Sequence, residues 1–438
     1  MRKYFGTDGV RGKVGEFPLT PDFALKLGFA AGKALSQGDK STIVVIGKDT
    51  RISCDLFVAA LASGLTYAGV NVLLAGTIPT PGVAYLTMKH QAIAGIVVSA
   101  SHNPFFDNGI KFFNEKGEKL DDSVELSIEA GIDTPFSAPE EGATGTIETI
   151  TDALTDYRDF CLASAPELSL KGDKIVVDCA NGATYQVVPE LFRQLGATVI
   201  EVGTAPNGTN INDAVGSTAP EKIIATVKAE KADYGIAFDG DGDRLLIIDE
   251  RGRPFDGDDI LYLLATERQE KAVVGTIMSN LGFELALEER GITLHRSNVG
   301  DRYVLELLNQ LSLNVGGENS GHILCLDQHS TGDGIIAALQ AIQLMKQSGA
   351  TFAEIRDRIP KTVQVMHNVK IERGAAWESE ALKVAMAEVE KALAGRGRIL
   401  IRPSGTEPVV RVMVESDAWE TSEKHTQYLA DIIRNSHH

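Results

Sequence analysis

The chain has 438 residues, which at about 150 residues per domain corresponds to about three domains. Acidic side chains outnumber basic ones by 60 to 42, so the formal net charge is −18 at pH 7. Proteins that bind nucleic acid or anionic membranes need basic faces, and this balance argues against both classes of partner. A local basic pocket for a small phosphorylated ligand is compatible with an acidic whole.

The cysteines and the first residues indicate the cellular compartment. The spacing of the cysteines predicts neither a zinc site nor a disulfide framework and is typical of reduced thiols. The first residues carry charge with no apolar stretch behind them, and no window approaches about 20 apolar residues. We therefore expect a cytoplasmic protein without a transmembrane helix. The four cysteines are Cys54, Cys161, Cys179 and Cys325.

Short apolar runs that lead into polar, glycine-rich loops recur along the chain. Such continuous runs predict strands that are buried on both faces. Capped helical stretches over about 20–37 and 55–68 lie between the first of them. This alternation is typical of an α/β fold, in which ligands bind beyond the carboxyl ends of the strands. The runs are 43–46, 93–98, 175–177, 235–238 and 273–278.

Two loop-like stretches and a change of pattern divide the chain. Residues 134–148 contain prolines and glycines without strong periodicity, and 249–254 form a second boundary. After about residue 365 the pattern becomes a strand, a helix, two strands and a last helix, at 363–372, 377–394, 398–402, 409–415 and 419–435. We predict three mixed α/β domains and a smaller C-terminal α+β domain, at 1–150, 151–252, 253–364 and 365–438.

The segment Ser99–Pro104 follows the apolar run 93–98, where Ser101 can present its hydroxyl to a ligand. Adjacent side chains of an extended segment point to opposite faces, so we expect His102 to be a poor general base for Ser101. The absence of a GxSxG elbow around the serine disfavours an α/β-hydrolase. Taken alone, the segment is equally compatible with a turn that Ser101 and Asn103 cap.

Asp239, Asp241 and Asp243 alternate with glycines behind the run 235–238. Without a cation, such crowding raises the pKa of at least one carboxyl group through like-charge repulsion. Oxygen ligands suit a hard divalent ion, Mg²⁺ or Ca²⁺. An EF-hand is disfavoured because Arg244 stands where its loop needs glycine and because the flanks predict strands. We predict a site for one Mg²⁺, which an anionic ligand completes.

Two further loops offer groups that bind phosphate and sugar. The first lies between two predicted strands and offers a guanidinium, hydroxyls and backbone N–H groups to a phosphate. The second offers a carboxylate, an amide and a hydroxyl to sugar hydroxyls or an amine. Each is also compatible with a plain turn. The phosphate candidates are Arg402, Ser404, Gly405 and Thr406, and the sugar candidates are Glu318, Asn319 and Ser320. Basic residues that could line a positive pocket are Arg11, Lys48, Arg51, Lys111 and Arg244.

The loops 99–104, 239–244, 317–322 and 402–406, in this order, resemble the four hallmark loops of the α-D-phosphohexomutase superfamily, with a match over residues 5–416. The segments Phe5–Gly12, Gly317–His322 and Arg402–Pro408 are similar to its bacterial phosphoglucosamine mutase branch. The resemblance implies four domains around a central cleft. It also implies interconversion of glucosamine 6-phosphate and glucosamine 1-phosphate, a step towards UDP-N-acetylglucosamine and cell-wall precursors, and a homodimer.

The resemblance further implies a mechanism in which Ser101 is carried as phosphoserine. Its phosphoryl group passes to the free hydroxyl of the sugar monophosphate, and the resulting 1,6-bisphosphate turns round and returns the other phosphoryl group. The aspartate triad holds Mg²⁺ against Ser101, and the 402–406 loop holds the distal phosphate. Lys111 and Arg244 lie near the transferring group, and Lys111 and His322 are both candidates for the acid/base. The implied substrate-binding residues are Arg11, His102, Glu318, Asn319 and Ser320.

The nearest alternative is the same chemistry on glucose or mannose phosphates, because one amine in place of a hydroxyl gives modest discrimination. An alternative of another class is a non-catalytic sugar-phosphate or metal-binding protein. A replaced Ser101 or a broken aspartate triad would favour it, and both are intact here. A serine hydrolase is the least favoured class, because the sequence around Ser101 has neither the GxSxG elbow nor a histidine that could act as its partner.

Overall fold

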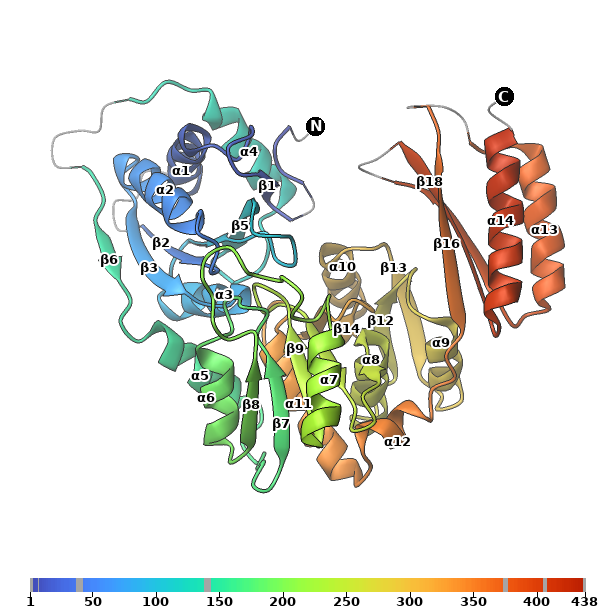
Figure 1. Cartoon of the computed structure of the whole chain (residues 1–438). Coiled ribbons are helices and arrows are strands. Elements are labelled where there is room, and N and C mark those ends of the chain that lie inside the picture. Colours follow the sequence, from blue (N-terminus) through green and yellow to red (C-terminus); the bar gives the residue numbers. More distant parts are fainter. Residues whose placement is uncertain are drawn as a thin grey trace.

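The structure is a computed structural model that describes residues 3–6, 8–36, 42–137, 143–372, 377–404 and 408–435. Four sheets, each with its own helices, follow one another along the chain (Figure 1). We call them units 1 to 4 and propose for them the bounds predicted from the sequence. Within the described ranges, no helix combines the length and the apolar character that a membrane span requires.

Unit 1 is a six-stranded sheet with helices on both faces. Strands β2, β3, β4 and β6 are parallel, β5 is antiparallel to its neighbour β4, and the edge strand β1 is antiparallel to β5. Helices α1, α2 and α4 cover one face, and α3 covers the other. The strands, in sheet order, are β1 (Val10–Lys13), β5 (Asp107–Asn114), β4 (Ala94–Val98), β2 (Ile43–Lys48), β3 (Asn71–Thr77) and β6 (Ile147–Thr149). The helices are α1 (Pro21–Ser36), α2 (Cys54–Tyr67), α3 (Thr80–Lys89) and α4 (Asp122–Ile132).

Unit 2 has a five-stranded sheet whose central strands β9 and β7 carry apolar residues on both faces. Its strands, in sheet order, are β11 (Pro254–Phe255), β10 (Leu245–Ile248), β9 (Tyr234–Phe238), β7 (Lys174–Asp178) and β8 (Thr198–Val202), so the edge strand β11 is added from just past the proposed bound at residue 252. Its helices are α5 (Ala153–Ala163), α6 (Val187–Gln194) and α7 (Glu221–Glu230).

Unit 3 has a four-stranded sheet, in which β13 and β14 flank β12 in parallel and β15 is antiparallel. In sheet order its strands are β13 (Thr293–Ser297), β12 (Ala272–Thr276), β14 (Val315–Gly317) and β15 (Ile323–Cys325). Its helices are α8 (Gly257–Glu267), α9 (Leu281–Glu288), α10 (Asp301–Leu311), α11 (Gly334–Ser348) and α12 (Phe352–Arg356).

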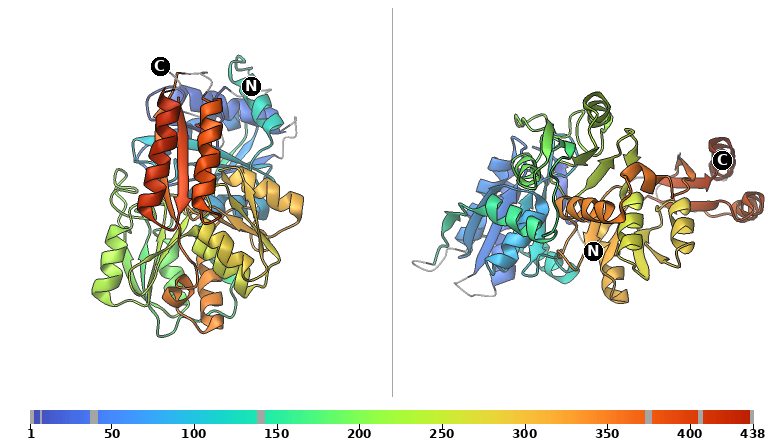
Figure 2. Two further views of the ribbon diagram at one scale, coloured as in Figure 1. Left: turned by 90° about the vertical axis from the view of Figure 1, so that its right-hand side faces the viewer. Right: turned by 90° about the horizontal axis from the view of Figure 1, so that it is seen from below.

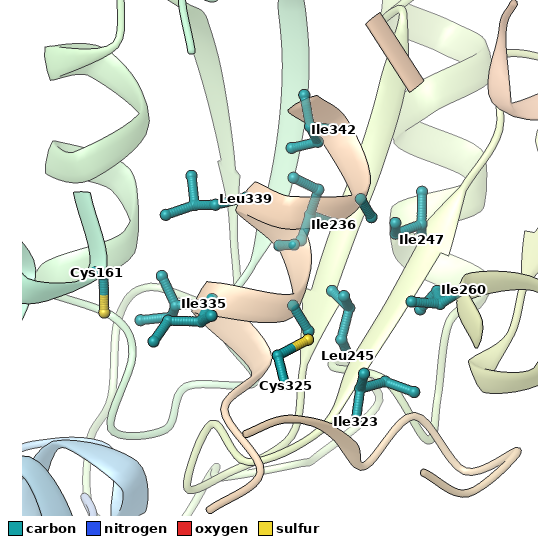
Figure 3. Packing of buried hydrophobic residues seen from close by; sticks show 14 of the residues in the cluster. Cys161, Ile236, Leu245, Ile247, Ile260, Ile323, Cys325, Ile335, Leu339 and Ile342 are labelled. Carbon is teal, nitrogen blue, oxygen red and sulfur yellow. The ribbon is translucent and has the colours of Figure 1, made fainter. Parts of the chain in front are cut away.

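One hydrophobic core joins the first three units. Helix α11 runs through it, and Ile335, Leu339 and Ile342 of this helix lie among side chains from β9 and β10 (Figure 3). Cys161 of α5 and Cys325 of β15 lie beside the same helix (Figure 3). All four cysteines are buried and free, in line with the sequence prediction. Because this core is shared and close-packed, it fixes the positions of the first three units relative to one another, and with them the loops that follow their strands.

Unit 4 stands on the far side of unit 3 from unit 1 (Figure 1). Its antiparallel sheet has the order β16 (Val363–Lys370), β18 (Val409–Ser416) and β17 (Arg398–Pro403). Helices α13 (Glu380–Leu393) and α14 (Trp419–Asn435) cover one face and form a separate core with it (Figure 2). Arg398 ties the unit to unit 3, because its guanidinium donates to the carbonyls of Ile277 (2.8 Å) and Ser279 (2.7 Å).

The predicted α/β fold with a C-terminal α+β unit is confirmed. The five apolar runs form β2, β4, β7, β9 and β12, and the last helix covers the predicted residues. The helix expected at 377–394 begins at Glu380, because the Ser379 hydroxyl accepts a hydrogen bond from the N–H of Leu382 and so caps the helix there.

Candidate active site

Ser101 lies in the loop behind β4, with 2% of its surface exposed and a left-handed backbone (φ 53°). Its hydroxyl donates to Asp239 Oδ2 at 2.6 Å, and His102 Nδ1 lies 3.3 Å from the hydroxyl oxygen of Ser101. The expectation that Ser101 and His102 point to opposite faces is therefore wrong, because the left-handed turn replaces the extended backbone on which it rested. Burial, and then the charges of Arg244 and Arg11, lower the pKa of His102 to about 4, so its ring is neutral at pH 7.

The three aspartates behind β9 are buried and converge. Oxygens of Asp239, Asp241 and Asp243 lie within 4.8 Å of one another. Asp239 Oδ1 accepts the N–H groups of Gly242 and Arg244, both at 3.1 Å. Burial, and then the charges of Asp243 and Asp241, raise the pKa of Asp239, as expected for carboxylates this close without a cation.

Two carboxylate oxygens of this triad are buried and have no hydrogen-bond partner among the residues that the structure describes, Oδ1 of Asp241 and Oδ1 of Asp243. A buried acceptor that lacks a donor is costly, and a cation removes that cost. The donor set consists of oxygens alone, which suits a hard divalent ion. The triad therefore can bind a metal ion.

Lys111, from β5, is 4% exposed and lies among carboxylates. Its Nζ is 2.8 Å from Asp241 Oδ2, 3.1 Å from Asp8 Oδ2 and 3.5 Å from Asp243 Oδ2. Burial lowers the pKa of this ammonium, but the three carboxylates outweigh burial and raise the pKa above its ordinary value. Lys111 therefore places a positive charge at the edge of the triad.

A cleft of about 830 Å³ opens above these groups, and its lining comes from the first three units. Eight of the predicted site residues line it. Within the described parts of the chain, unit 4 contributes nothing to the lining. Lys111, His102, Asp239 and Asp241 are not lining residues, but each lies next to Ser101 or Asp243, which are. The predicted residues that line it are Arg11, Ser101, Asp243, Arg244, Glu318, Asn319, Ser320 and His322.

Sequence reasoning missed a charged bridge across this cleft. Lys119 of unit 1 lies 2.7 Å from Asp8 Oδ1 and 2.6 Å from Asp301 Oδ2, at the start of α10 in unit 3. Asp301 also lies 3.8 Å from His322 Nε2. The available signal was the polar loop behind the strand over 293–297, which has the same character as the loops that were recognised.

His322 is 4% exposed, and its Nδ1 lies 3.7 Å from Asp243 Oδ1. Burial lowers the pKa of this imidazole, but Asp243, followed by Asp301, outweighs burial and raises the pKa to about 9. The ring is therefore protonated at neutral pH and adds a positive charge to the cleft. Glu318 beside it accepts the N–H of Gly300 at 3.0 Å, which fixes its carboxylate at the wall.

The predicted phosphate loop follows β17. Arg402 is on that strand, Ser404 N donates to Val409 O at 2.8 Å, and Gly405 and Thr406 lie outside the described residues. Arg402 stands opposite Arg411 in the register of β17 and β18. Burial, and then the charge of Arg411, lower the pKa of Arg402. Two like charges paired across strands repel each other, and an anion between them relieves this repulsion.

Comparison with known proteins agrees with this architecture. Four family profiles, described as phosphoglucomutase/phosphomannomutase alpha/beta/alpha domains I, II and III and the C-terminal domain, match residues 2–138, 152–252, 256–363 and 366–434. The fold and the cleft therefore define a phosphohexomutase enzyme of four domains.

Curated relatives narrow the class. The chain is 52% identical to a phosphoglucosamine mutase of Cupriavidus metallidurans, over 99% of both chains. It is 54% identical to a phosphoglucosamine mutase of Chromobacterium violaceum, over 95% of both. The chain belongs to the phosphoglucosamine mutase family.

Solved structures share the fold at lower identity. A phosphoglucomutase/phosphomannomutase family protein of Burkholderia thailandensis superimposes with a TM-score of 0.81 at 23% identity, over 98% of this chain and 97% of that one. An N-acetylphosphoglucosamine mutase of Aspergillus fumigatus, solved with GlcNAc-6P and magnesium, has a TM-score of 0.70 at 17% identity, over 100% and 96%.

Proposed function

We propose that this chain interconverts glucosamine 6-phosphate and glucosamine 1-phosphate, with Ser101 as the carrier of the phosphoryl group. The observation that carries the proposal is the Ser101 hydroxyl, which lies 2.6 Å from Asp239 in the lining of a cleft that also holds Arg11 and Arg244. The names and full-length identity of the curated relatives support the amino sugar as substrate.

The reaction consists of two phosphoryl transfers. In the first, the bond between phosphorus and Ser101 Oγ breaks, a bond to the free hydroxyl oxygen of the sugar monophosphate forms, and that hydroxyl gives up its proton. The product is glucosamine 1,6-bisphosphate and unmodified Ser101. After the bisphosphate has turned round, Ser101 takes the other phosphoryl group, a proton returns to the freed sugar oxygen, and the second monophosphate leaves. A trace of sugar 1,6-bisphosphate therefore primes the unmodified enzyme.

Asp239, Asp241 and Asp243 are the residues that would hold Mg²⁺ beside Ser101. When bound, the ion supplies positive charge that neutralises the phosphoryl oxygens. The two unpartnered carboxylate oxygens support this assignment. The hydrogen bonds from backbone N–H groups to Asp239 keep that carboxylate turned towards Ser101.

Positive side chains near the transferring phosphoryl group neutralise the rest of its negative charge. Arg11 and Arg244 line the cleft together with Ser101, and Lys111 is paired with Asp241 of the triad. Phosphoryl transfer depends mainly on such positioning and charge neutralisation. An acid/base must also exchange a proton with the sugar hydroxyl, and Lys111 and His322 both remain candidates.

The sugar and its second phosphate need sites that serve both orientations. We assign the sugar to Glu318, Asn319 and Ser320 on one wall, with His102 near the reacting oxygen. We assign the distal phosphate to Arg402, Ser404, Gly405 and Thr406, and add Arg411 because it faces Arg402. The described residues of unit 4 do not line the cleft, so the assignment of Arg402 and Arg411 requires these two residues to approach the bound sugar.

The test compares initial rates on the monophosphates of glucosamine, glucose and mannose, with Mg²⁺ and a trace of sugar bisphosphate. We expect a clear preference for glucosamine phosphate and no turnover by the Ser101→Ala variant. Equal or higher rates on glucose or mannose phosphates would keep the mechanism and replace the substrate. Substantial activity of pure Ser101→Ala would contradict the role of Ser101. A homodimer and a cytoplasmic location stay predictions.

A further inference from the structure

A buried polar cluster lies behind Ser101, on the side away from the cleft. Asp49 and Arg51 belong to the loop behind β2, and Ser99 precedes Ser101 in its own loop. These three residues are 1%, 2% and 0% exposed. The proposed reaction uses none of them, although burying an ion pair such as Asp49 and Arg51 costs more than burying apolar side chains of similar size.

The cluster holds the two peptide carbonyls that flank His102. Arg51 Nη2 donates to Asn103 O at 2.5 Å and to Ser101 O at 3.2 Å. Asn212, from unit 2, donates through Nδ2 to the same two oxygens at 3.0 and 2.9 Å. Each carbonyl oxygen therefore accepts two hydrogen bonds, one from a donor of unit 1 and one from a donor of unit 2.

The amide side of Ser101 is fixed by the same cluster. The N–H of Ser101 donates to Ser99 Oγ at 2.9 Å, and the Ser99 hydroxyl donates to Asp49 Oδ2 at 2.5 Å. Asp49 in turn pairs with Arg51 and accepts its N–H at 2.9 Å. The left-handed backbone of Ser101, which is unfavourable for a residue with a side chain, is thus held from both of its peptide groups.

We propose that Arg51 and Asn212 are positioning residues that hold Ser101 in line for phosphoryl transfer. This inference rests on the proposed role of Ser101 as phosphoryl carrier. Asp239, the partner of the Ser101 hydroxyl, belongs to unit 2, as does Asn212. The two carbonyls thus accept hydrogen bonds from a donor of unit 1 and a donor of unit 2. These bonds fix the position of Ser101, in unit 1, relative to the carboxylates of unit 2. Small displacements of a reacting group lower the rate of the chemical step while binding elsewhere is unchanged.

The experiment uses the full chain with one change on each side of the loop. Asn212→Gly removes the amide and tolerates the left-handed backbone at that position (φ 58°). Its matched control is Ala214→Gly, at an exposed left-handed position (φ 52°) of the same loop. Arg51→Lys keeps the charge beside Asp49 but lacks the planar fork that reaches two carbonyls. The measurements are kcat, KM, the thermal midpoint, and the single-turnover rate of transfer from phosphorylated Ser101 to sugar monophosphate.

We expect Asn212→Gly and Arg51→Lys each to lower kcat and the single-turnover rate by about 10- to 100-fold. KM should stay within about twofold of the wild type, as it does when an interaction acts on the chemical step alone. Ala214→Gly should match the wild type. A wild-type single-turnover rate in folded Asn212→Gly or Arg51→Lys, or a loss confined to KM, would overturn the inference. If wild-type Ser101 never carries phosphate, the proposed function fails instead.

Discussion

Gly240 lies between the first two aspartates of the triad. We predict that a single methyl group at this position lowers the rate of the reaction but leaves the protein folded. A Cβ built there would lie 2.5 Å from Ser101 O and 2.8 Å from Asn212 Nδ2. It would also lie 2.8 Å from Ile211 Cδ1. Ordinary van der Waals contact begins near 3.4 Å. Gly240→Ala must therefore move the loop 239–244 away from the loop 99–104 by about 0.9 Å, the difference between 3.4 and 2.5 Å.

The size of the effect follows from this displacement. Overpacking of a buried site costs about 1–3 kcal/mol, which is small against the stability of a large shared core. A shift of about 1 Å in a reacting group, however, can lower the rate of the chemical step on the order of 100-fold. We therefore expect Gly240→Ala to fold, to lose roughly this factor in kcat, and to require more Mg²⁺ for half-maximal rate.

The assay compares kcat, KM and the thermal midpoint of Gly240→Ala with those of Gly131→Ala. Gly131 lies in α4, where the nearest atom to an added Cβ would be Ala30 Cβ at 3.2 Å, a side-chain contact remote from the cleft. Alanine is favoured over glycine in a helix by up to about 1 kcal/mol, so this variant should keep its activity and its stability. Wild-type kcat in Gly240→Ala would refute the reasoning, because it would show that the close approach of the two loops is not needed for transfer.

Three further predictions concern metal, phosphate and pH. Asp241→Asn should raise the Mg²⁺ concentration for half-maximal rate by about tenfold or more, and an unchanged metal titration would count against the triad. Arg402→Ala should raise KM far more than it lowers kcat, because it removes binding of the distal phosphate, and a normal KM would contradict this role. Burial, and then Asp256, raise the pKa of Asp258 to about 7. The folded state therefore keeps this proton between about pH 4 and 7 while the unfolded state loses it, and stability falls as the pH rises through that window. Asp258→Asn should consequently raise the urea midpoint above that of the wild type, and by more at pH 8 than at pH 5. An equal increase at both pH values would contradict the raised pKa of Asp258.

Much of the fold was predictable because its signals are local. Apolar runs of β-rich residues became buried strands, and the helices expected over about 20–37 and 55–68 are α1 and α2, with α1 beginning directly after Thr20 and α2 ending two residues before Gly69. The C-terminal unit was recognisable from the change of periodicity after residue 365. What periodicity cannot give is the order of strands within a sheet, or that α11 would run through a core shared by three units, because both depend on contacts between distant segments.

The site was predictable where one loop holds all the chemistry, as in the aspartate triad. It was not predictable where the contacts cross between units or strands. Lys119 and Asp301 are far apart in sequence and meet only because units 1 and 3 face each other. Arg411 lies beside Arg402 through strand register, and the contact of His102 with Ser101 follows from one left-handed residue. None of these leaves a pattern in a short window of sequence.

Glycines in the triad loop and in the neighbouring loop behind β7 show how sequence and structure give different information about the site. In the sequence, Gly240 and Gly242 separate the three aspartates, a spacing that lets the carboxylates converge on one point. In the structure, a Cβ at Gly182 would lie 2.2 Å from Gly240 O, and one at Gly240 would lie 2.5 Å from Ser101 O. Three backbone segments, from β7, β9 and β4, are thus stacked at distances that side chains forbid. Because Arg51 and Asn212 hold the last of them, the alignment of Ser101 with Asp239 depends as much on the absence of side chains at Gly182 and Gly240 as on the charges around it.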